Sequence, residues 1–451
     1  MTGGYASRDP KGTVKLTPER KLYILGATLL VALTICSRNF GDRGGPHFMA
    51  SLTLAAAAYL LAISEFFSAP KFPRRVVVVG LVLAAVWHVE FLRLPPGADD
   101  DIHRYVWDGR LQRLGFNPYL VIPSDPAVSE LHTAETRNLN NPDLPSPYPA
   151  GAQLFFRAVT AIHESTFALK VAFVLCEFGI VFVLLGILRI GGRSSHLVLA
   201  FAWNPLLAIE VAGSGHIDIV GALLLVISVA ALARHWRAIA AVTFGLAVAV
   251  KFLPIVLLPL YWKRVRIRDA ALAVVVAGLM YLPFLNHGHI PIGSLGAYVQ
   301  GFRFNDPMFA ALDEVAPPQL LAGLAVLVGL VTATWQRNHT RQKTLTTPRL
   351  RRVFKISDFA WPMAATLLFA PVVFPWYLLW LLPFLTSSST LPIIVWTVSI
   401  IPTYIMWHFR MLGRPWGALP AWVMVVEYGC MAVTGIVMGL SRSGEPDNAA
   451  L

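Results

Sequence analysis

The sequence predicts an all-α membrane protein, a bundle of transmembrane helices in a single domain. Of its 451 residues, 56% are hydrophobic and only 14% are charged, whereas soluble domains carry about a quarter charged residues. The mean hydropathy is +0.61, and apolar runs recur along the whole chain. We therefore expect about 12–14 membrane segments between residues 21 and 440, with cytoplasmic tails at 1–20 and 441–451.

The net charge of +12 comes from basic residues in the short loops between apolar runs. The positive-inside rule places such loops in the cytoplasm, so the charge indicates membrane topology and argues against a nucleic-acid partner. The cysteines lie in apolar stretches, without the CxxC or Cys/His spacing of a zinc site. We interpret them as buried thiols and expect neither a disulfide framework nor structural zinc.

The same rule predicts on which side each loop lies. Basic residues gather in a few loops, which we assign to the cytoplasm: 20–21, 71–75, 189–193, 234–237, 263–266 and 337–355. The loops between them then lie outside, and the longest non-membrane segment, 94–166, is one of these. These assignments bring the polar clusters of the chain to one outer face.

The apolar runs predict the helices that connect these loops. The expected helices are 22–36, 47–67, 75–93, 167–190, 195–212, 218–233, 270–285, 320–335, 391–407 and 420–440. Two further apolar stretches, 238–262 and 358–385, do not suit a single span. We interpret them as hairpins broken at the proline-containing turns 251–254 and 371–377, because non-helical backbone is tolerated at membrane depth only beside a polar cavity.

Three consecutive aspartates at 99–101 follow the third apolar run directly. Carboxylates so close to lipid are costly unless they lie in water or take part in chemistry. Residues 102–114 then have helical spacing, and Gly115 is a stop signal. We expect this helix to present one polar face and to lie with the other on the membrane surface. The polar face comprises Asp101, Arg104, Tyr105 and Asp108, and the apolar side Ile102, Val106 and Leu114.

A series of short motifs follows in a fixed order. They are DDIHRYVWDGR (100–110), GFNPY (115–119), YPAGAQ (148–153), WNP (203–205), GHID (215–218), KFLP (251–254), FND (304–306) and PWY (375–377). In this order they resemble bacterial GT-C glycosyltransferases of the mannosyltransferase-like kind, from about residue 75 to 385. The sequence departs from that pattern at Ala150, where a second proline usually stands, and at Phe374, often a histidine. The second departure argues against a catalytic role for the turn 371–377.

The resemblance implies an integral-membrane enzyme whose donor is a polyprenyl-phosphate sugar of the undecaprenyl or decaprenyl type. It implies transfer of a hexose, mannose in this group, to a glycan or glycolipid acceptor on the outer face of the inner membrane. It also implies that a carboxylate of the first long outer loop acts as the base. Inversion at the anomeric carbon is a hypothesis from the donor class.

A carboxylate of the acidic stretch is the expected base, because glycosyl transfer with inversion needs one group to take the proton from the attacking hydroxyl. Asp101 is the first candidate, since it faces the same way as Arg104, and Asp100 is the second. One alternative is that an aspartate, first of all Asp99, only caps the following helix, worth about 1 kcal/mol. Another is that Asp99, Asp100 and Asp101 hold a divalent cation, Mg²⁺ or Mn²⁺, through their oxygens.

Cations near the outer face are the candidates for binding the donor phosphate. Lys251 leads them because it lies at the apex of a hairpin, close to a proline. Arg104, Arg303 and Arg410 are candidate helpers. For these arginines the alternative is snorkelling to the lipid headgroups.

Other polar side chains on the same face are candidates for binding the sugar or the acceptor. They are Tyr105, Asp108, Tyr148, Gln153, His216, Asp218, Asn305, Asp306, Trp376 and His408. Simpler roles stay open for three of them. Asp218 can cap a helix, Trp376 can belong to an interfacial aromatic belt, and Tyr148 can shape its loop.

Two other classes of protein remain alternatives. A secondary transporter or flippase of a lipid-linked sugar would also contain proline-broken helices. Such a protein has little use for an acidic, aromatic-rich outer loop with its own helix, and the two halves show no inverted similarity. A non-catalytic assembly factor for envelope glycans would tolerate exchange of the aspartates.

Overall fold

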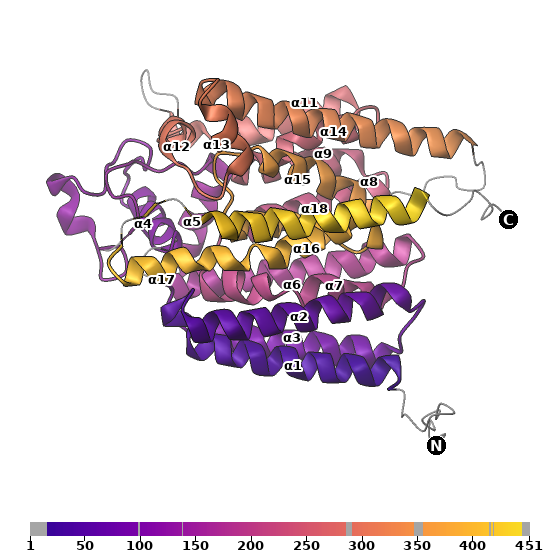
Figure 1. The fold of residues 1–451 in the computed structure, drawn as a ribbon. Helices are drawn as coiled ribbons and strands as arrows, with labels where there is room; N and C mark the ends of the chain where they lie inside the picture. Colours follow the sequence, from indigo (N-terminus) through magenta and orange to yellow (C-terminus); the bar gives the residue numbers. More distant parts are fainter. Residues whose placement is uncertain are drawn as a thin grey trace, which may run out of the picture.

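The computed structural model describes residues 16–97, 100–137, 139–285, 291–346, 355–414, 416–417 and 419–443. In this part of the chain the regular structure is helical, which confirms the predicted fold class. The helices run roughly side by side along the bundle, with α4, α12, α13 and α17 gathered at one end (Figure 1). Their bounds are α4 Ile102–Arg113, α12 Leu295–Gly301, α13 Pro307–Asp313 and α17 Ile405–Met411.

Eight helices among the described residues are long and apolar enough to cross a membrane. Four precede residue 200: α1 Pro18–Arg38, α2 Pro46–Ser68, α3 Arg74–Leu92 and α6 Thr166–Ile190. The other four are Ile267–Phe284, which contains α11 (Ile267–Leu279), Pro318–His339 of α14 (Pro318–Thr346), Ser388–Met411, which contains α16 (Leu391–Ser399) and α17, and Ala421–Ser441 of α18 (Ala421–Ser443). The protein is therefore a multi-pass membrane protein.

Shorter and broken segments complete the bundle. Ser195–Ala202, which ends in α7 (Leu199–Ala202), and η4 (Leu207–Gly213) form an apolar helix pair that is bent by 67° at the Asn204-Pro205 break. Three apolar helices are too short to span alone: α5 Ala150–Ile162, α8 Asp218–Ala233 and α9 Arg237–Val250. The described residues thus hold eight spans, or nine if the bent pair is one span, which is fewer than the roughly 12–14 segments expected; α8 and α9 account for two further expected segments at less than full length.

Both expected breaks lie where the prolines predict them. Helix α9 ends at Val250, Lys251 is extended, and the short helices η5 (Leu253–Leu257) and α10 (Leu258–Tyr261) follow. Helix α15 (Ala360–Leu368) is followed by the turn 371–374 and then η9 (Pro375–Trp380). The residue before a proline is biased away from helical backbone, and the preceding helix ends close to that point in both cases.

Helix α4 has the predicted limits but not the predicted environment. It ends at Arg113, and Gly115 takes a positive φ of 86° just beyond, as a stop signal requires. The prediction that α4 lies on the membrane surface is wrong. Ile102 and Val106 are buried, and so is most of the polar face, because the loop 116–149 and α5 cover the helix.

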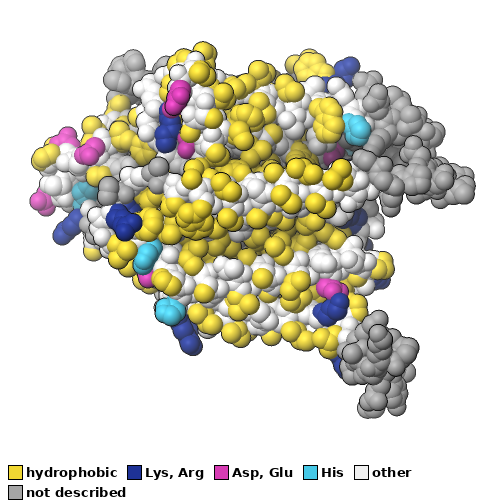
Figure 2. Space-filling model, in the orientation of Figure 1, with side chains coloured by type: hydrophobic (Ala, Val, Ile, Leu, Met, Phe, Trp, Pro, Cys, Tyr) yellow, Lys and Arg dark blue, Asp and Glu magenta, His cyan; other side chains and the backbone are white. Residues whose placement is uncertain are grey.

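The surface follows the composition of the spans. Hydrophobic side chains cover the sides of the helices in Figure 2, while most of the charged side chains on this face lie near the two ends. Of the cysteines expected to be buried, Cys36 is buried and Cys176 is partly buried. Cys430 is exposed, because α18 packs little of its surface against the bundle.

Candidate active site

A cavity of about 440 Å³ is lined in part by residues of α4, α12 and α17. These helices lie at one end of the bundle (Figure 1). Segments far apart in sequence line it. The polar and aromatic lining residues are Asp101, Tyr105, Asn140, Asn141, Tyr148, Asp218, Lys251, Phe252, Tyr298, Phe302, Phe374, Trp376, Tyr377, Trp407, Arg410 and Trp416. The structure thus brings together seven candidates that are scattered over more than 300 positions of the sequence.

Asp101 lies directly before α4 and lines the cavity. The Asn140 side chain donates a hydrogen bond to its Oδ1 at 2.6 Å. The carboxylate does not cap α4, whose first turn receives no side-chain hydrogen bond; only the Asp101 backbone carbonyl accepts from Arg104 and Tyr105. The position therefore suits a carboxylate that meets a ligand.

Asp100 has a different environment. Its carboxylate is buried, forms an ion pair with Arg43 at 2.8 Å, and accepts a hydrogen bond from the Gly97 amide at 2.6 Å. Arg43 in turn donates to the Ser214 hydroxyl at 2.5 Å. Asp100 is absent from the cavity lining, so this pair ties α4 to the segment before α8.

The predicted metal site falls partly beyond what the structure describes. Asp99 lies outside the described residues. Among the residues that are described, no three His, Cys, Asp or Glu side chains lie close enough together to hold a metal ion. The carboxylates of Asp100 and Asp101 have the separate partners given above.

Lys251 and Asp218 form the polar floor of the cavity. The Lys251 ammonium donates to Asp218 Oδ1 at 2.7 Å and lies 3.7 Å from the centre of the Tyr377 ring. The Trp380 indole N–H donates to the same oxygen at 2.7 Å. Asp218 is therefore a buried counter-ion, not a cap of α8, whose first turn has no side-chain hydrogen bond. The break after α9 delivers the lysine to this place.

A stack of rings forms one wall. His216 lies flat against Trp376, with centroids 4.0 Å apart, and Trp376 lies flat against Phe374 at 4.3 Å. Only Phe374 and Trp376 of these three line the cavity. Trp376 is thus part of a cavity wall rather than of a lipid-facing aromatic belt.

His216 sits behind this wall and is buried. Its Nδ1 is 3.0 Å from Glu210 Oε2, and the Tyr404 hydroxyl donates to the other oxygen of Glu210. The expected sugar-binding histidine therefore reaches the cavity only through Trp376.

The three arginine candidates lie in different environments. Arg410 lines the cavity. Arg104 is buried and donates to the backbone carbonyls of Asn140, Asn141 and Leu144. It therefore holds the backbone of a segment that lines the cavity, without lining the cavity itself. Arg303 pairs with Asp313 at 2.9 Å, away from the lining.

Several acceptor candidates also lie outside the cavity. Asp108 and Gln153 form a buried cluster with Ser146, in which the Gln153 amide donates to Asp108 Oδ2 at 2.9 Å and the Ser146 hydroxyl donates to the same oxygen. Asn305 pairs with Glu427, and Asp306 follows it at the start of α13. His408 pairs with Asp42 at 2.7 Å. Tyr105 and Tyr148, by contrast, meet edge to face in the cavity wall.

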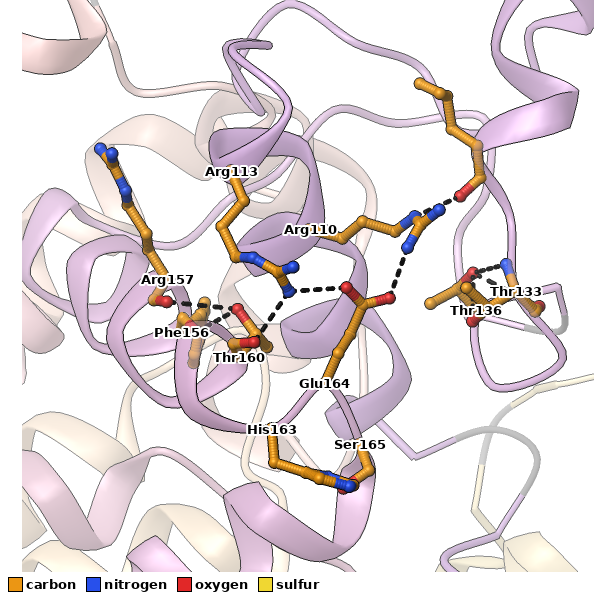
Figure 3. A network of polar contacts seen from close by, with 11 residues as sticks. Arg110, Arg113, Thr133, Thr136, Phe156, Arg157, Thr160, His163, Glu164 and Ser165 are labelled. Carbon is orange, nitrogen blue, oxygen red and sulfur yellow. Dashed lines mark hydrogen bonds and ion pairs between the residues drawn. The ribbon is translucent and has the colours of Figure 1, made fainter.

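An arginine–glutamate network joins α4 to the end of α5 (Figure 3). Glu164, just after α5, accepts hydrogen bonds at 2.7 Å from Arg110 and from Arg113, both on α4. Arg113 also donates to the Thr160 carbonyl at 2.7 Å. The network braces α4 against α5 on the side away from Asp101.

The Asp108 cluster gives a testable dependence on pH. Burial raises the pKa of Asp108 from its usual 3.8 to about 6, so the folded protein keeps a proton that the unfolded chain releases. This contribution to stability is present below pH 4 and is lost as the pH rises toward 6. Asp108→Asn removes the titration and still accepts both hydrogen bonds. Its free energy of unfolding should therefore gain on that of the wild type by up to about 3 kcal/mol as the pH rises from 4 to 6, measured as a rise of its melting temperature in detergent relative to the wild type.

An exposed acid on the same loop provides the control for this experiment. Glu130→Gln should leave the pH profile of the melting temperature unchanged, since Glu130 is exposed. A constant difference between Asp108→Asn and the wild type across this pH range would contradict the assignment.

Some residues of the site escape sequence reasoning. Arg43, Asn140, Tyr298 and Trp380 have no local signal. Glu210 and Glu427 do have one, since each is an ionisable residue inside an apolar run, and such residues are costly within a membrane unless they have a role.

Comparison with curated proteins and with solved structures finds no match. A family model described as alpha-(1->6)-mannopyranosyltransferase, N-terminal domain, matches residues 32–265, more than half of the chain. The matched part supplies the polar half of the cavity, including Asp101, Asp218 and Lys251. The stacked rings of Phe374 and Trp376, which we call the ring wall, and Arg410 lie beyond the matched part. The chain therefore belongs to the alpha-(1->6)-mannopyranosyltransferase family and is a mannosyltransferase.

Proposed function

We propose that the protein transfers mannose from a polyprenyl-phosphate mannose donor to a hydroxyl group of a glycan or glycolipid acceptor. We place the reaction on the outer face of the inner membrane and assign Asp101 as the base. The observation that carries the proposal is the cavity itself, in which a carboxylate, a lysine, an arginine and aromatic rings face one space. A sugar phosphate and a hydroxyl acceptor need these groups.

The proposed step is an inverting displacement. The acceptor hydroxyl loses its proton to Asp101 as its oxygen attacks the anomeric carbon, and the bond from that carbon to the phosphate oxygen breaks. Polyprenyl phosphate leaves with the electron pair. Asn140 holds one carboxylate oxygen of Asp101 at 2.6 Å, which supports the other oxygen as the proton acceptor.

Cations in the cavity suit the leaving group. Lys251 and Arg410 both line it, and a point charge and a planar fork are the two forms of cation that suit phosphate oxygens. Asp218 balances Lys251 from below. The charges of Asp101, Asp218, Lys251 and Arg410 therefore sum to about zero before the donor arrives. The donor phosphodiester brings one negative charge. As its bond to the sugar breaks, the phosphate gains a second negative charge while the proton from the acceptor neutralises Asp101.

The lipid part of the donor has an apolar neighbour. Phe252 lines the cavity and is 37% exposed. Ile255 and Leu258 continue this exposed apolar surface along η5 and α10. A prenyl chain leaving the cavity beside Phe252 would thus meet apolar side chains. The proposed face follows from charge bias, which assigns the basic loops to the cytoplasm and the loop 94–166 to the outside.

Transfer by the purified protein tests the proposal. The full-length protein in detergent is incubated with polyprenyl-phosphate mannose, with its glucose and arabinose counterparts, or with a nucleoside-diphosphate mannose, together with extracted membrane glycolipids. We expect a mass increase of one hexose on the acceptor with polyprenyl-phosphate mannose alone. Product from the nucleotide sugar alone would contradict the donor assignment.

A chelator tests how the phosphate charge is neutralised. If Lys251 and Arg410 neutralise the leaving group, transfer should persist after dialysis against EDTA. The measurement is the initial rate before and after dialysis, and again after adding Mg²⁺ or Mn²⁺. Loss of activity that either ion restores would instead favour a cation site built on the acidic stretch, for which Asp99, Asp100 and Asp101 supply oxygen ligands.

A further inference from the structure

Glu427 is an acidic residue buried within a membrane-spanning helix. It lies on α18, a candidate membrane span of which only 11% is buried, yet its own side chain is fully buried. A carboxylate at such a position is costly and indicates a role. Glu427 does not line the cavity, so that role is not direct contact with substrate.

The partners of Glu427 come from two other segments. The Asn305 amide donates to both carboxylate oxygens, at 3.0 and 2.9 Å, and the Trp396 indole N–H donates to one at 2.6 Å. The neighbouring Tyr428 hydroxyl donates to the Asn305 backbone carbonyl at 2.7 Å. Asn305 is thus held by α18 through both its side chain and its backbone.

The conformation of Asn305 depends on these bonds. Its φ is 55°, in the left-handed region that costs most residues energy but that asparagine tolerates. This turn sets the direction of the chain at Phe304, immediately before it. A residue in this conformation persists where its surroundings hold it.

Phe304 connects this anchor to the cavity wall. Its amide donates to the Pro371 carbonyl at 3.2 Å, and its carbonyl accepts from the Val373 amide at 2.9 Å, which makes a short parallel bridge with Val372. Its ring stacks on Phe374 at 4.5 Å. Phe374 then stacks on Trp376, which faces the cavity.

We propose that Glu427 is a positioning residue of the transferase: through Asn305 and Phe304 it holds the turn 371–377, and so the Phe374–Trp376 wall, against the cavity. The inference rests on the proposed function only in so far as the wall contacts the sugar donor. The physical link itself, from Glu427 to the turn, is a property of the fold.

The first test measures that link without any substrate. Hydrogen–deuterium exchange of a peptide covering 371–377 reports the Val373 amide, which the bridge protects. We expect Glu427→Leu to speed this exchange by about tenfold or more. Glu427→Gln should preserve it, because the glutamine oxygen can take the place of Glu427 Oε1, which accepts from both Trp396 and the Asn305 amide. Glu90→Leu, which removes another acid from an apolar span, is the matched control and should leave the peptide unchanged.

The second test measures transfer by the same variants. A displaced wall should lower kcat/KM for the donor by about 10- to 100-fold in Glu427→Leu, mainly through KM, while Glu427→Gln and Glu90→Leu keep most activity. Asn305→Asp sets two carboxylates against each other and should be impaired in the same way. The double variant Asn305→Asp with Glu427→Gln restores one carboxylate and one amide, and should recover exchange protection and KM in part. Recovery is not complete because the aspartate cannot replace the bond at 3.3 Å that the Asn305 amide donates to the Val373 carbonyl.

The outcomes separate the two proposals. Unchanged exchange at 371–377 in Glu427→Leu overturns the inference whatever the enzyme transfers. A wild type that does not use polyprenyl-phosphate mannose overturns the proposed donor, and exchange still decides the link. If Glu427→Leu does not fold, failure of the double variant to rescue Asn305→Asp would contradict the positioning role.

Discussion

Asp101→Asn should lower the rate of mannosyl transfer by about 10²–10⁴-fold, the range that one positioned base contributes, with the protein still folded. The asparagine keeps the size of the side chain and can still contact Asn140, but it cannot take a proton from the acceptor. The measurement is kcat with polyprenyl-phosphate mannose at saturating acceptor. The melting temperature in detergent should change little, because the Asp101 side chain is only partly buried and does not cap α4.

Two acids on the same loop sharpen this result. Glu130→Gln changes an exposed acid and should leave kcat unaltered. Asp100→Asn should act on stability instead, because it leaves Arg43 buried without its counter-ion, and breaking a buried pair in this way costs about 3–5 kcal/mol. Full transfer by Asp101→Asn, with the protein present in the membrane at the normal level, would refute Asp101 as the base.

Lys251→Met should produce the second large effect, a loss of both transfer and stability. It removes a cation from the cavity and leaves Asp218 buried with Trp380 as its remaining side-chain donor. We expect kcat/KM to fall by about 10²–10³-fold, the scale on which a single stabilising group acts in catalysis. The melting temperature should fall as well, since truncating one side of a buried charged pair is strongly destabilising.

A double variant separates these two losses. Lys251→Met combined with Asp218→Asn leaves no unpaired charge, and the asparagine oxygen can still accept from the Trp380 indole. We expect the melting temperature to recover, measured by differential scanning fluorimetry, while transfer stays low because the cation is still absent. Recovery of transfer together with stability would mean that Lys251 has only a structural role.

Local patterns predicted the membrane-spanning elements of this protein well, but not α5, α12 and α13, which lie in stretches expected as outer loops. Residues close in sequence determine where an apolar helix forms, where Gly115 ends α4 and where the two proline-containing breaks lie. The structure has these features at the positions that the sequence indicates. The surface position of α4 was not predictable in this way. Its burial depends on the cover that 116–149 and α5 provide. Carbonyls and side chains far along the chain accept from or donate to several of its buried polar groups, including the Arg104 guanidinium and one oxygen of Asp108.

Partners distant in sequence explain the rest. Asp100 and Asp101 are neighbours in sequence. Asp100 forms the ion pair and Asp101 lines the cavity because Arg43, which lies in another loop, is close to Asp100. Asn305 is a sugar-binding candidate by sequence, and its contact with Glu427 lies across 122 positions. Charge bias brought these groups to one end of the molecule, but it carries no information on which of them touch.

The position of the ring wall has a consequence for how such enzymes can diversify. The carboxylate and lysine lie within the matched N-terminal part, whereas Tyr298, Trp376 and Arg410 lie after residue 265. A chain cut at that point would keep Asp101, the proposed base, and lose one side of its cavity. Selection for a new acceptor can therefore act on the second half of the chain while the first half preserves the chemistry.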